Sequence, residues 1–211
     1  FIFTCHPGIT ALIRGEGEEP LRALLSAWQQ GQQPGVVPRT VLRVGEELNT
    51  GPDSPPLKEL DTVPSPFRSG LVDMARGFVY YETSRGCPFH CSFCLSARDN
   101  LLRSYSMERI KSDLLLLMQK GVAKIKLVDR TFNFDASRAR EIFSFILEHN
   151  RSTHFHFEIA GHLLDEATLE LLEKVPEEMF QFEIGVQSTL ESTLDAIGRK
   201  VNMKKLEENI R

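Results

Sequence analysis

Three cysteines crowded into one short stretch, Cys87, Cys91 and Cys94, are the residues best suited to do chemistry. Their C-x3-C-x2-C spacing puts three thiols in one loop, directly after a run with strand character. Three thiolates can bind three irons of a cubane cluster and leave the fourth iron open, whereas electron-transfer clusters usually have four cysteines. An open iron can take a chelating cofactor or substrate. The spacing therefore predicts a [4Fe–4S] cluster with one open iron.

A structural zinc site is the main alternative for these thiols. It needs a fourth ligand, for which His90 and Cys5 are the candidates. Zinc ligands usually come as two spaced pairs, and the sequence has no second pair. Cys5 stands alone and is more typical of a small buried apolar residue. Because a secreted disulfide scaffold would spread an even number of cysteines along the chain, the crowding favours a metal site in a reducing cytoplasm.

Length and composition are those of an ordinary globular protein. The 211 residues are 41% hydrophobic and 26% charged, which suits one or two domains. No apolar run approaches the roughly 18 residues that cross a bilayer, so we expect no membrane partner. The formal net charge of -4 argues against a nucleic-acid partner. Because the first residue is Phe1 rather than Met, we expect a fragment of a longer protein.

Residue patterns divide the chain into three parts. Residues 1–30 contain one strand and one amphipathic helix, a β–α unit too small to be a domain alone. Residues 31–76 hold most of the prolines, and we expect an extended connector with a hairpin near residues 41–48. Residues 77–211 alternate between strand and helix patterns and should carry the chemistry.

This last part predicts four βα units. The expected strands are 78–83, 124–129, 154–159 and 180–186, and the expected helices are 106–120, 136–150, 165–174 and 189–197. Successive βα units imply parallel strands with right-handed crossovers. The predicted fold class is therefore α/β, a partial (βα) barrel whose last strand keeps an open edge. Active sites of βα barrels lie at the C-terminal strand ends, where the cysteine loop begins.

Alternation of polar and apolar residues along the third and fourth strands selects further candidates. Glu158 and Gln187 continue the polar faces of these strands to their C-terminal ends, so we expect both to face a cofactor. Glu183 lies deeper on the same face. An internal ion-pair network with Lys124 and Lys126 is the alternative interpretation of these polar residues.

Phe93, directly before the third cysteine, completes a motif that resembles the radical S-adenosylmethionine (SAM) superfamily. In that family the open iron binds SAM, and an electron from the cluster cleaves SAM to a 5′-deoxyadenosyl radical that abstracts hydrogen. The resemblance implies that the three cysteines hold the cluster and that Phe93, Asp129, Glu158, Gln187 and Arg199 contact SAM. By strict alternation, however, Asp129 points outward at the end of its strand.

Longer segments resemble the cobalamin-binding-domain class of that superfamily, in a bacterial branch with a further C-terminal domain of unknown function. These segments are Gly15–Glu18 and residues 80–87, 126–133, 155–158 and 182–188. The resemblance implies that residues 1–30 are the C-terminal end of a Rossmann-like, cobalamin-binding-type domain, that 31–76 are a connector, and that 77–211 are a partial radical SAM barrel. The D-x-H-x-x-G loop of cobalamin domains is absent.

The resulting hypothesis is a cytoplasmic enzyme that cleaves SAM reductively for hydrogen abstraction. Cobalamin-dependent methyl transfer is one outcome open to the full-length protein. Its implied partners are a small-molecule substrate and an electron donor such as flavodoxin or ferredoxin. The alternatives are a methylthiotransferase, an enzyme similar to coproporphyrinogen dehydrogenase, and a non-catalytic metal-binding module.

The cysteine motif generates the first testable prediction. Replacing Cys87, Cys91 or Cys94 singly with Ala should abolish stable cubane assembly, because three adjacent thiolates balance the charge of the irons. Iron and sulfide content after anaerobic reconstitution measures the effect, with Cys5→Ser as the control that should keep the cluster. An unchanged iron content in Cys91→Ala would refute the assignment.

Overall fold

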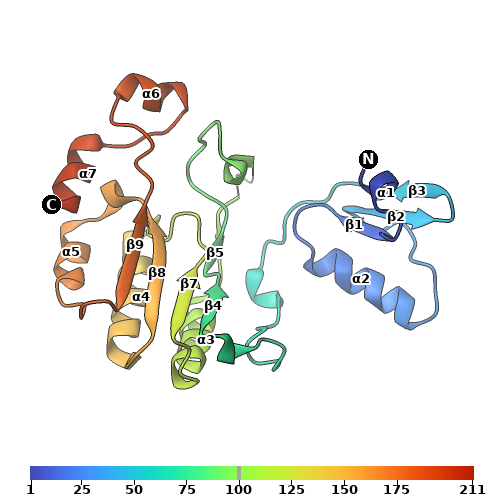
Figure 1. Cartoon of the computed structure of the whole chain (residues 1–211), viewed down its shortest axis with the longest axis horizontal. Helices are drawn as coiled ribbons and strands as arrows, with labels where there is room; N and C mark the ends of the chain where they lie inside the picture. The colour runs from blue at the N-terminus through green and yellow to red at the C-terminus, as the bar shows by residue number, and fades with distance from the viewer. Residues whose placement is uncertain (99–100) are drawn as a thin grey trace. The chain divides into compact units, whose positions relative to one another are not determined.

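The computed structural model describes residues 1–98 and 101–211 and divides into two compact units, Phe1–Lys58 and Glu59–Arg211 (Figure 1). The boundary between the units therefore differs from the boundaries expected at residues 30 and 76. The segment between those two positions is not a free connector, because its first part belongs to a small sheet and its last part packs on the second unit.

The first unit is a three-stranded antiparallel sheet with one long helix. Its elements are α1 (Ile2–Cys5), β1 (Ala11–Ile13), α2 (Glu18–Gln29), β2 (Thr40–Val44) and β3 (Glu47–Thr50). The hairpin expected near residues 41–48 is present as β2 and β3, and β2 also pairs antiparallel with β1. The predicted β–α unit is present as β1 and α2, but its sheet partner is the hairpin rather than a parallel strand.

Residues 59–76 belong to the second unit because their side chains are anchored to its sheet and first helix. The Ser65 hydroxyl donates a hydrogen bond to the buried Asp113 carboxylate at 2.8 Å. Arg109 donates to the carbonyl of Val63 at 3.1 Å. Phe67 packs on the ring of Tyr81, with centroids 5.6 Å apart. These contacts explain why the boundary falls before this segment rather than after it.

The second unit is built on a parallel sheet, which confirms the predicted α/β class. The sheet order is β4-β7-β8-β9, and all three pairings are parallel. Its strands are β4 (Phe78–Tyr81), β7 (Lys124–Leu127), β8 (His154–Ile159) and β9 (Phe180–Ile184). Within the described residues β9 is an outer strand, as expected for a partial barrel. The strands point toward the cysteine loop in Figure 1.

Helices cover one face of this sheet and short elements surround its C-terminal edge. The covering helices are α3 (Met107–Gln119), α4 (Ala136–His149) and α5 (Glu166–Leu172). Two further helices, α6 (Glu191–Ala196) and α7 (Met203–Ile210), follow β9. A two-stranded ribbon, β5 (Ser84–Arg85) with β6 (Arg103–Ser104), brackets the cysteine loop. Four 3-10 turns complete the chain: η1 (Leu60–Thr62), η2 (Met74–Arg76), η3 (Leu95–Arg98) and η4 (Gly161–Leu163).

Side-chain caps set where the three covering helices begin. Ser106, Asp135 and Asp165 each accept a hydrogen bond from the backbone N–H three residues later. Such caps satisfy a backbone donor that the helix itself leaves unpaired. The Thr168 hydroxyl and then Arg140 lower the pKa of Asp165 to about 2, so this cap is ionised at neutral pH. These caps therefore determine the residue at which each of the three helices begins.

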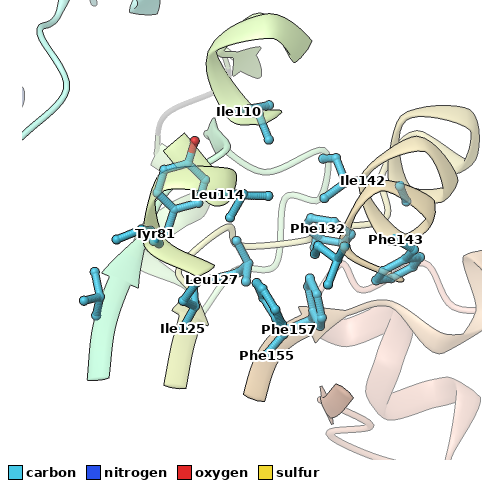
Figure 2. Packing of buried hydrophobic residues seen from close by; sticks show 14 of the residues in the cluster. Tyr81, Ile110, Leu114, Ile125, Leu127, Phe132, Ile142, Phe143, Phe155 and Phe157 are labelled. Atoms are coloured by element: carbon cyan, nitrogen blue, oxygen red, sulfur yellow. The ribbon is translucent and has the colours of Figure 1, made fainter. Parts of the chain in front are cut away.

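Phenylalanine dominates the core between the sheet and its helices. Phe157 is fully buried, and its ring lies 4.7 Å from that of Phe132 and 5.1 Å from that of Phe143. Figure 2 shows these rings with Phe155 between the strands and the helix that carries Phe143. Tilted and edge-on aromatic pairs add about 0.5–1.5 kcal/mol each beyond the area they bury. This aromatic layer holds β8 against α4.

Truncating the centre of this layer should strongly destabilise the second unit. Phe157→Ala removes a fully buried ring, and such changes cost about 3–5 kcal/mol. Chemical denaturation followed by circular dichroism measures the change. Phe78→Ala, at a ring that is 51% exposed on β4, is the matched control and should change stability little. Equal losses in the two variants would contradict the proposed centre of the core.

Candidate cluster and cofactor site

All three cysteines of the motif line one cavity at the C-terminal edge of the parallel sheet. The cysteine loop contributes Cys87, Phe89, Cys91, Phe93, Cys94 and Ser96 to its wall. The segments that end β7, β8 and β9 contribute Arg130, Thr131, Glu158, Ile159, Ala160, Glu183 and Gly185, and Arg199 comes from the segment after α6. The cavity therefore lies where parallel βα folds place their active sites.

Tight backbone contacts fix the cysteine loop at its start. Gly86, directly before Cys87, has φ +96, and a Cβ there would lie 2.5 Å from the carbonyl oxygen of Leu101. Only glycine combines this backbone conformation with so close an approach. Farther along the loop, the Ser92 N–H donates to the carbonyl of Ile197 at 2.9 Å. The loop is thus held both by its own ribbon and by the end of α6.

Cys87 and Cys91 each have a polar partner from outside the loop. The Cys87 sulfur lies 3.5 Å from the hydroxyl of Thr131. An N–H of Arg199 donates to the Cys91 sulfur at 3.7 Å, and Cys91 is buried. Two of the three sulfurs therefore have a polar neighbour contributed by another part of the fold.

The third thiol is polarised by its own turn. The backbone N–H of Ser96 and then the Ser96 hydroxyl lower the pKa of the Cys94 thiol, and the charge of Arg130 adds to the effect. All four cysteines of the chain are free. The donor set at the cavity is thus three free thiols with polar or charged neighbours, which fits a three-cysteine iron–sulfur cluster.

A site for a single metal ion is not formed by these thiols. Across residues 1–98 and 101–211, no three His, Cys, Asp or Glu side chains are arranged to hold one metal ion. His90, a candidate fourth zinc ligand, is exposed and is not part of the cavity wall. A cubane places each cysteine on a different iron, so its ligands need only surround a common space.

Of the residues predicted to contact SAM, Phe93, Glu158 and Arg199 line the cavity. The Phe93 side chain is 57% exposed, and Glu158 is half-buried. Gln187 lies at the rim instead, because its left-handed backbone (φ 67) folds the carboxamide back over Gly185. Its nitrogen is 2.6 Å from the point that a Cβ on Gly185 would occupy.

Asp129 occupies a different place from the one predicted for it. It lies two residues beyond β7, is completely buried, and is not part of the cavity wall. Its carboxylate accepts hydrogen bonds from the Thr83 N–H at 3.0 Å and from the hydroxyls of Thr83 and Ser84. Arg138 lies 3.9 Å away and also donates to Thr83. Asp129 thus anchors the chain directly beyond β4.

The polar inner face of the sheet forms the ion-pair network that was the alternative interpretation. His156 and Lys126 lie 3.3 Å and 3.8 Å from the Glu183 carboxylate. Lys124 donates to Gln181 at 2.9 Å. Burial and then the charge of Lys126 lower the pKa of His156, so it is neutral at pH 7. Glu183 therefore belongs to this network and also reaches the cavity.

The cavity residues that sequence reasoning missed include Phe89, Ser96, Arg130 and Thr131. Arg130 and Thr131 come directly after a predicted strand, and that position at the C-terminal edge was the available signal. Phe89 packs on His162 of η4, with ring centroids 5.8 Å apart. Burial and then the charges of Arg199 and Lys205 lower the pKa of His162, which keeps this neighbour of the loop neutral.

Comparison with known proteins identifies the family. Residues 81–211 match the model of the radical SAM superfamily. The chain belongs to the radical SAM superfamily. The resemblance noted in the sequence is thereby confirmed, and the matched residues contain all three cysteines, Glu158 and Arg199.

The similar proteins include cobalamin-dependent members of this superfamily. The cobalamin-dependent radical SAM methyltransferase TokK of Streptomyces tokunonensis is 35% identical over 62% of this chain and 21% of its own length. The hopanoid C-3 methylase of Methylococcus capsulatus is 28% identical over 93% of the chain and 38% of its own length. This chain therefore spans only a part of its curated relatives.

Solved structures share the fold at low sequence identity. The cobalamin-dependent SAM radical enzyme OxsB with aqua-cobalamin bound has a TM-score of 0.77 and 20% identity, covering 100% of this chain and 32% of that one. The radical SAM methyltransferase TsrM of Kitasatospora setae has a TM-score of 0.72 and 16% identity, covering 100% and 44%. In the part of this chain that the structure describes, no helix is both long and apolar enough to span a membrane.

The buried carboxylate of Asp129 should be essential to the stability of the loop's attachment. Asp129→Ala leaves the hydrogen-bond donors of Thr83 and Ser84 without their acceptor, and it removes the negative charge that faces Arg138. Breaking a buried charge network in this way costs about 3–5 kcal/mol. Denaturation and hydrogen exchange at the Thr83 amide measure the effect, with exposed Asp195→Ala as control. Wild-type stability and protection in Asp129→Ala would contradict this anchoring role.

Proposed function

We propose that this chain provides the cluster- and SAM-binding part of a radical SAM methyltransferase. The observation that carries the proposal is the convergence of Cys87, Cys91 and Cys94 on one cavity in a chain of this superfamily. The names of its relatives favour methyl transfer over a methylthiotransferase, a coproporphyrinogen dehydrogenase-like enzyme or a non-catalytic metal module. The chain spans 21% and 31% of the first two curated relatives, so the activity belongs to a longer protein.

The three cysteines would hold a [4Fe–4S] cluster through their thiolates. The cluster and SAM, when bound, supply a 5′-deoxyadenosyl radical that can take a hydrogen atom from an unreactive carbon. The surroundings of the thiols suit this role, because Arg199 and Thr131 lie against two sulfurs and Ser96 lowers the pKa of the third. Low dielectric around buried Cys91 strengthens these interactions.

Glu158 and Phe93 are the side chains best placed to hold SAM. The half-buried Glu158 carboxylate can accept hydrogen bonds from an ammonium group or from ribose hydroxyls. The exposed ring of Phe93 offers an apolar face to the rest of the cofactor. Gln187 at the rim could reach a bound cofactor only by leaving its place over Gly185. For Asp129 we propose support of the loop in place of SAM contact.

Cobalamin is a cofactor of the full-length protein in this proposal. The support is that relatives and structural neighbours are described as cobalamin-dependent. Residues 1–30 would be the end of the cobalamin-binding-type domain, as β1 and α2. No residue of this chain is assigned to the cobalamin itself, because the D-x-H-x-x-G loop is absent from the sequence.

The proposed partners are a small-molecule substrate and a reducing protein such as flavodoxin or ferredoxin. The superfamily's chemistry supports both, since cluster reduction needs an electron donor. Four free cysteines suit a reducing compartment, and we propose the cytoplasm.

Anaerobic reconstitution tests this function. The protein should acquire a cubane spectrum, and chemical reduction with dithionite should convert SAM to 5′-deoxyadenosine and methionine.

Glu158→Gln should keep the cluster but bind SAM about ten- to a hundredfold more weakly, because a charge-assisted hydrogen bond is worth about 1.5–3 kcal/mol. Isothermal calorimetry measures the affinity, with exposed Glu173→Gln as the matched control. Colourless protein with one tightly bound zinc would refute the proposal.

A further inference from the structure

Arg199 joins three separate parts of the site. One N–H donates to the Cys91 sulfur at 3.7 Å, and another donates to the carbonyl of Gly185 beyond β9. Its backbone N–H closes the end of α6 by donating to the carbonyl of Leu194 at 2.8 Å. The remaining side-chain nitrogen, Nε, is buried without a partner in the described part of the chain. The guanidinium is therefore held in place beside a buried thiol.

The backbone around Arg199 is attached to the cysteine loop independently of that side chain. The Ser92 N–H donates to the carbonyl of Ile197 at 2.9 Å. Gly198 has φ +65, and a Cβ there would lie 3.3 Å from the carbonyl oxygen of His90. One hydrogen bond and one close backbone approach, on either side of Cys91, thus join the cysteine loop to the segment that precedes Arg199. They restrict how far the guanidinium can move from the Cys91 sulfur.

The partner of Cys87 lacks such a fixed donor. The Thr131 hydroxyl donates its one hydrogen to the carbonyl of Arg130 at 2.8 Å. To donate to a Cys87 thiolate it would have to give up that bond. Arg199, by contrast, has N–H groups enough for both of its acceptors and is always charged. Among these two partners, only Arg199 offers a permanent charged hydrogen bond.

We propose that Arg199 raises the reduction potential of the cluster by donating a charged hydrogen bond to the Cys91 thiolate. This inference rests on the proposed function, because it requires the cluster. Reduction adds one electron, here from dithionite, and no proton moves. The added negative charge is stabilised by a nearby cation and by hydrogen bonds to the sulfurs, which are among the factors that set cluster potentials. Arg199 is thus a positioning residue that acts through Cys91.

The midpoint potential of the reconstituted protein, measured by electron paramagnetic resonance titration without SAM, tests this inference. Arg199→Met should make the cluster about tenfold harder to reduce, a shift of about 59 mV to more negative potential for a one-electron couple. Arg199→Lys keeps the charge but loses the planar fork, so its shift should have the same sign and be smaller. If Arg199 served only to hold SAM, the potential without SAM would not move.

Lys200→Met is the matched control. It also removes one positive charge, but from the exposed residue that follows Arg199. Solvent screening should leave its potential near that of the wild type. Equal potentials in wild type, Arg199→Met and Lys200→Met would overturn the inference while leaving the cluster in place. If Arg199→Met assembles no cubane, the test is made on Arg199→Lys. A potential equal to that of the wild type in Arg199→Lys would then overturn the inference. A wild type without a cubane would refute the proposed function itself.

Discussion

The buried carboxylate of Asp129 connects the sheet to the loop that carries the chemistry. Its hydrogen bonds reach the backbone and hydroxyl of Thr83 and the hydroxyl of Ser84, directly beyond β4. These residues begin the path to Cys87. Because the carboxylate is completely buried, losing these hydrogen bonds would leave an unpaired buried charge. The free-energy cost of such a charge favours this one arrangement of Thr83 and Ser84 around Asp129. The loop that carries Cys87, Cys91 and Cys94 is attached to the sheet at this junction.

The two faces of the parallel sheet have different roles, one in stability and the other in chemistry. One face carries the phenylalanine layer centred on Phe157, which packs on α4. The other face is polar, and the charge of Lys126 lies against that of Glu183. An ion-pair network on this face gives a defined arrangement of charges below the cavity. The cavity at the C-terminal edge thus has a rigid apolar support on one side and a polar wall on the other.

Charge balance gives the cavity its chemical character. The cavity wall brings three thiols together in a small volume, and Arg130 and Arg199 are its cations. Arg199 is held by a sulfur and a carbonyl, whereas Arg130 acts on Cys94 through space. Coulomb interactions of this kind weaken quickly in water, so the burial of Cys91 matters as much as the presence of the arginine.

Sequence patterns were sufficient to predict the cluster motif, the parallel strands and the apolar face of β8. Cysteine spacing is a local property, and strand alternation determines which side chains share a face. Alternation also places Glu158 at the C-terminal edge, and the structure puts it in the cavity wall. These features could be predicted because each depends only on residues close together in the chain.

Contacts between distant residues were decided by the tertiary structure. β7 ends at Leu127, so parity no longer applies at Asp129, and its partners Thr83 and Ser84 are more than forty positions away. The hairpin of β2 and β3 pairs with β1 only because the chain folds back on itself, which no local pattern of prolines reveals. Arg199 meets Cys91 across 108 positions, through the packing of the segment after α6 on the cysteine loop. Hydrogen bonds between such distant groups depend on where the fold brings them together, and the spacing of residues along the sequence does not predict those contacts.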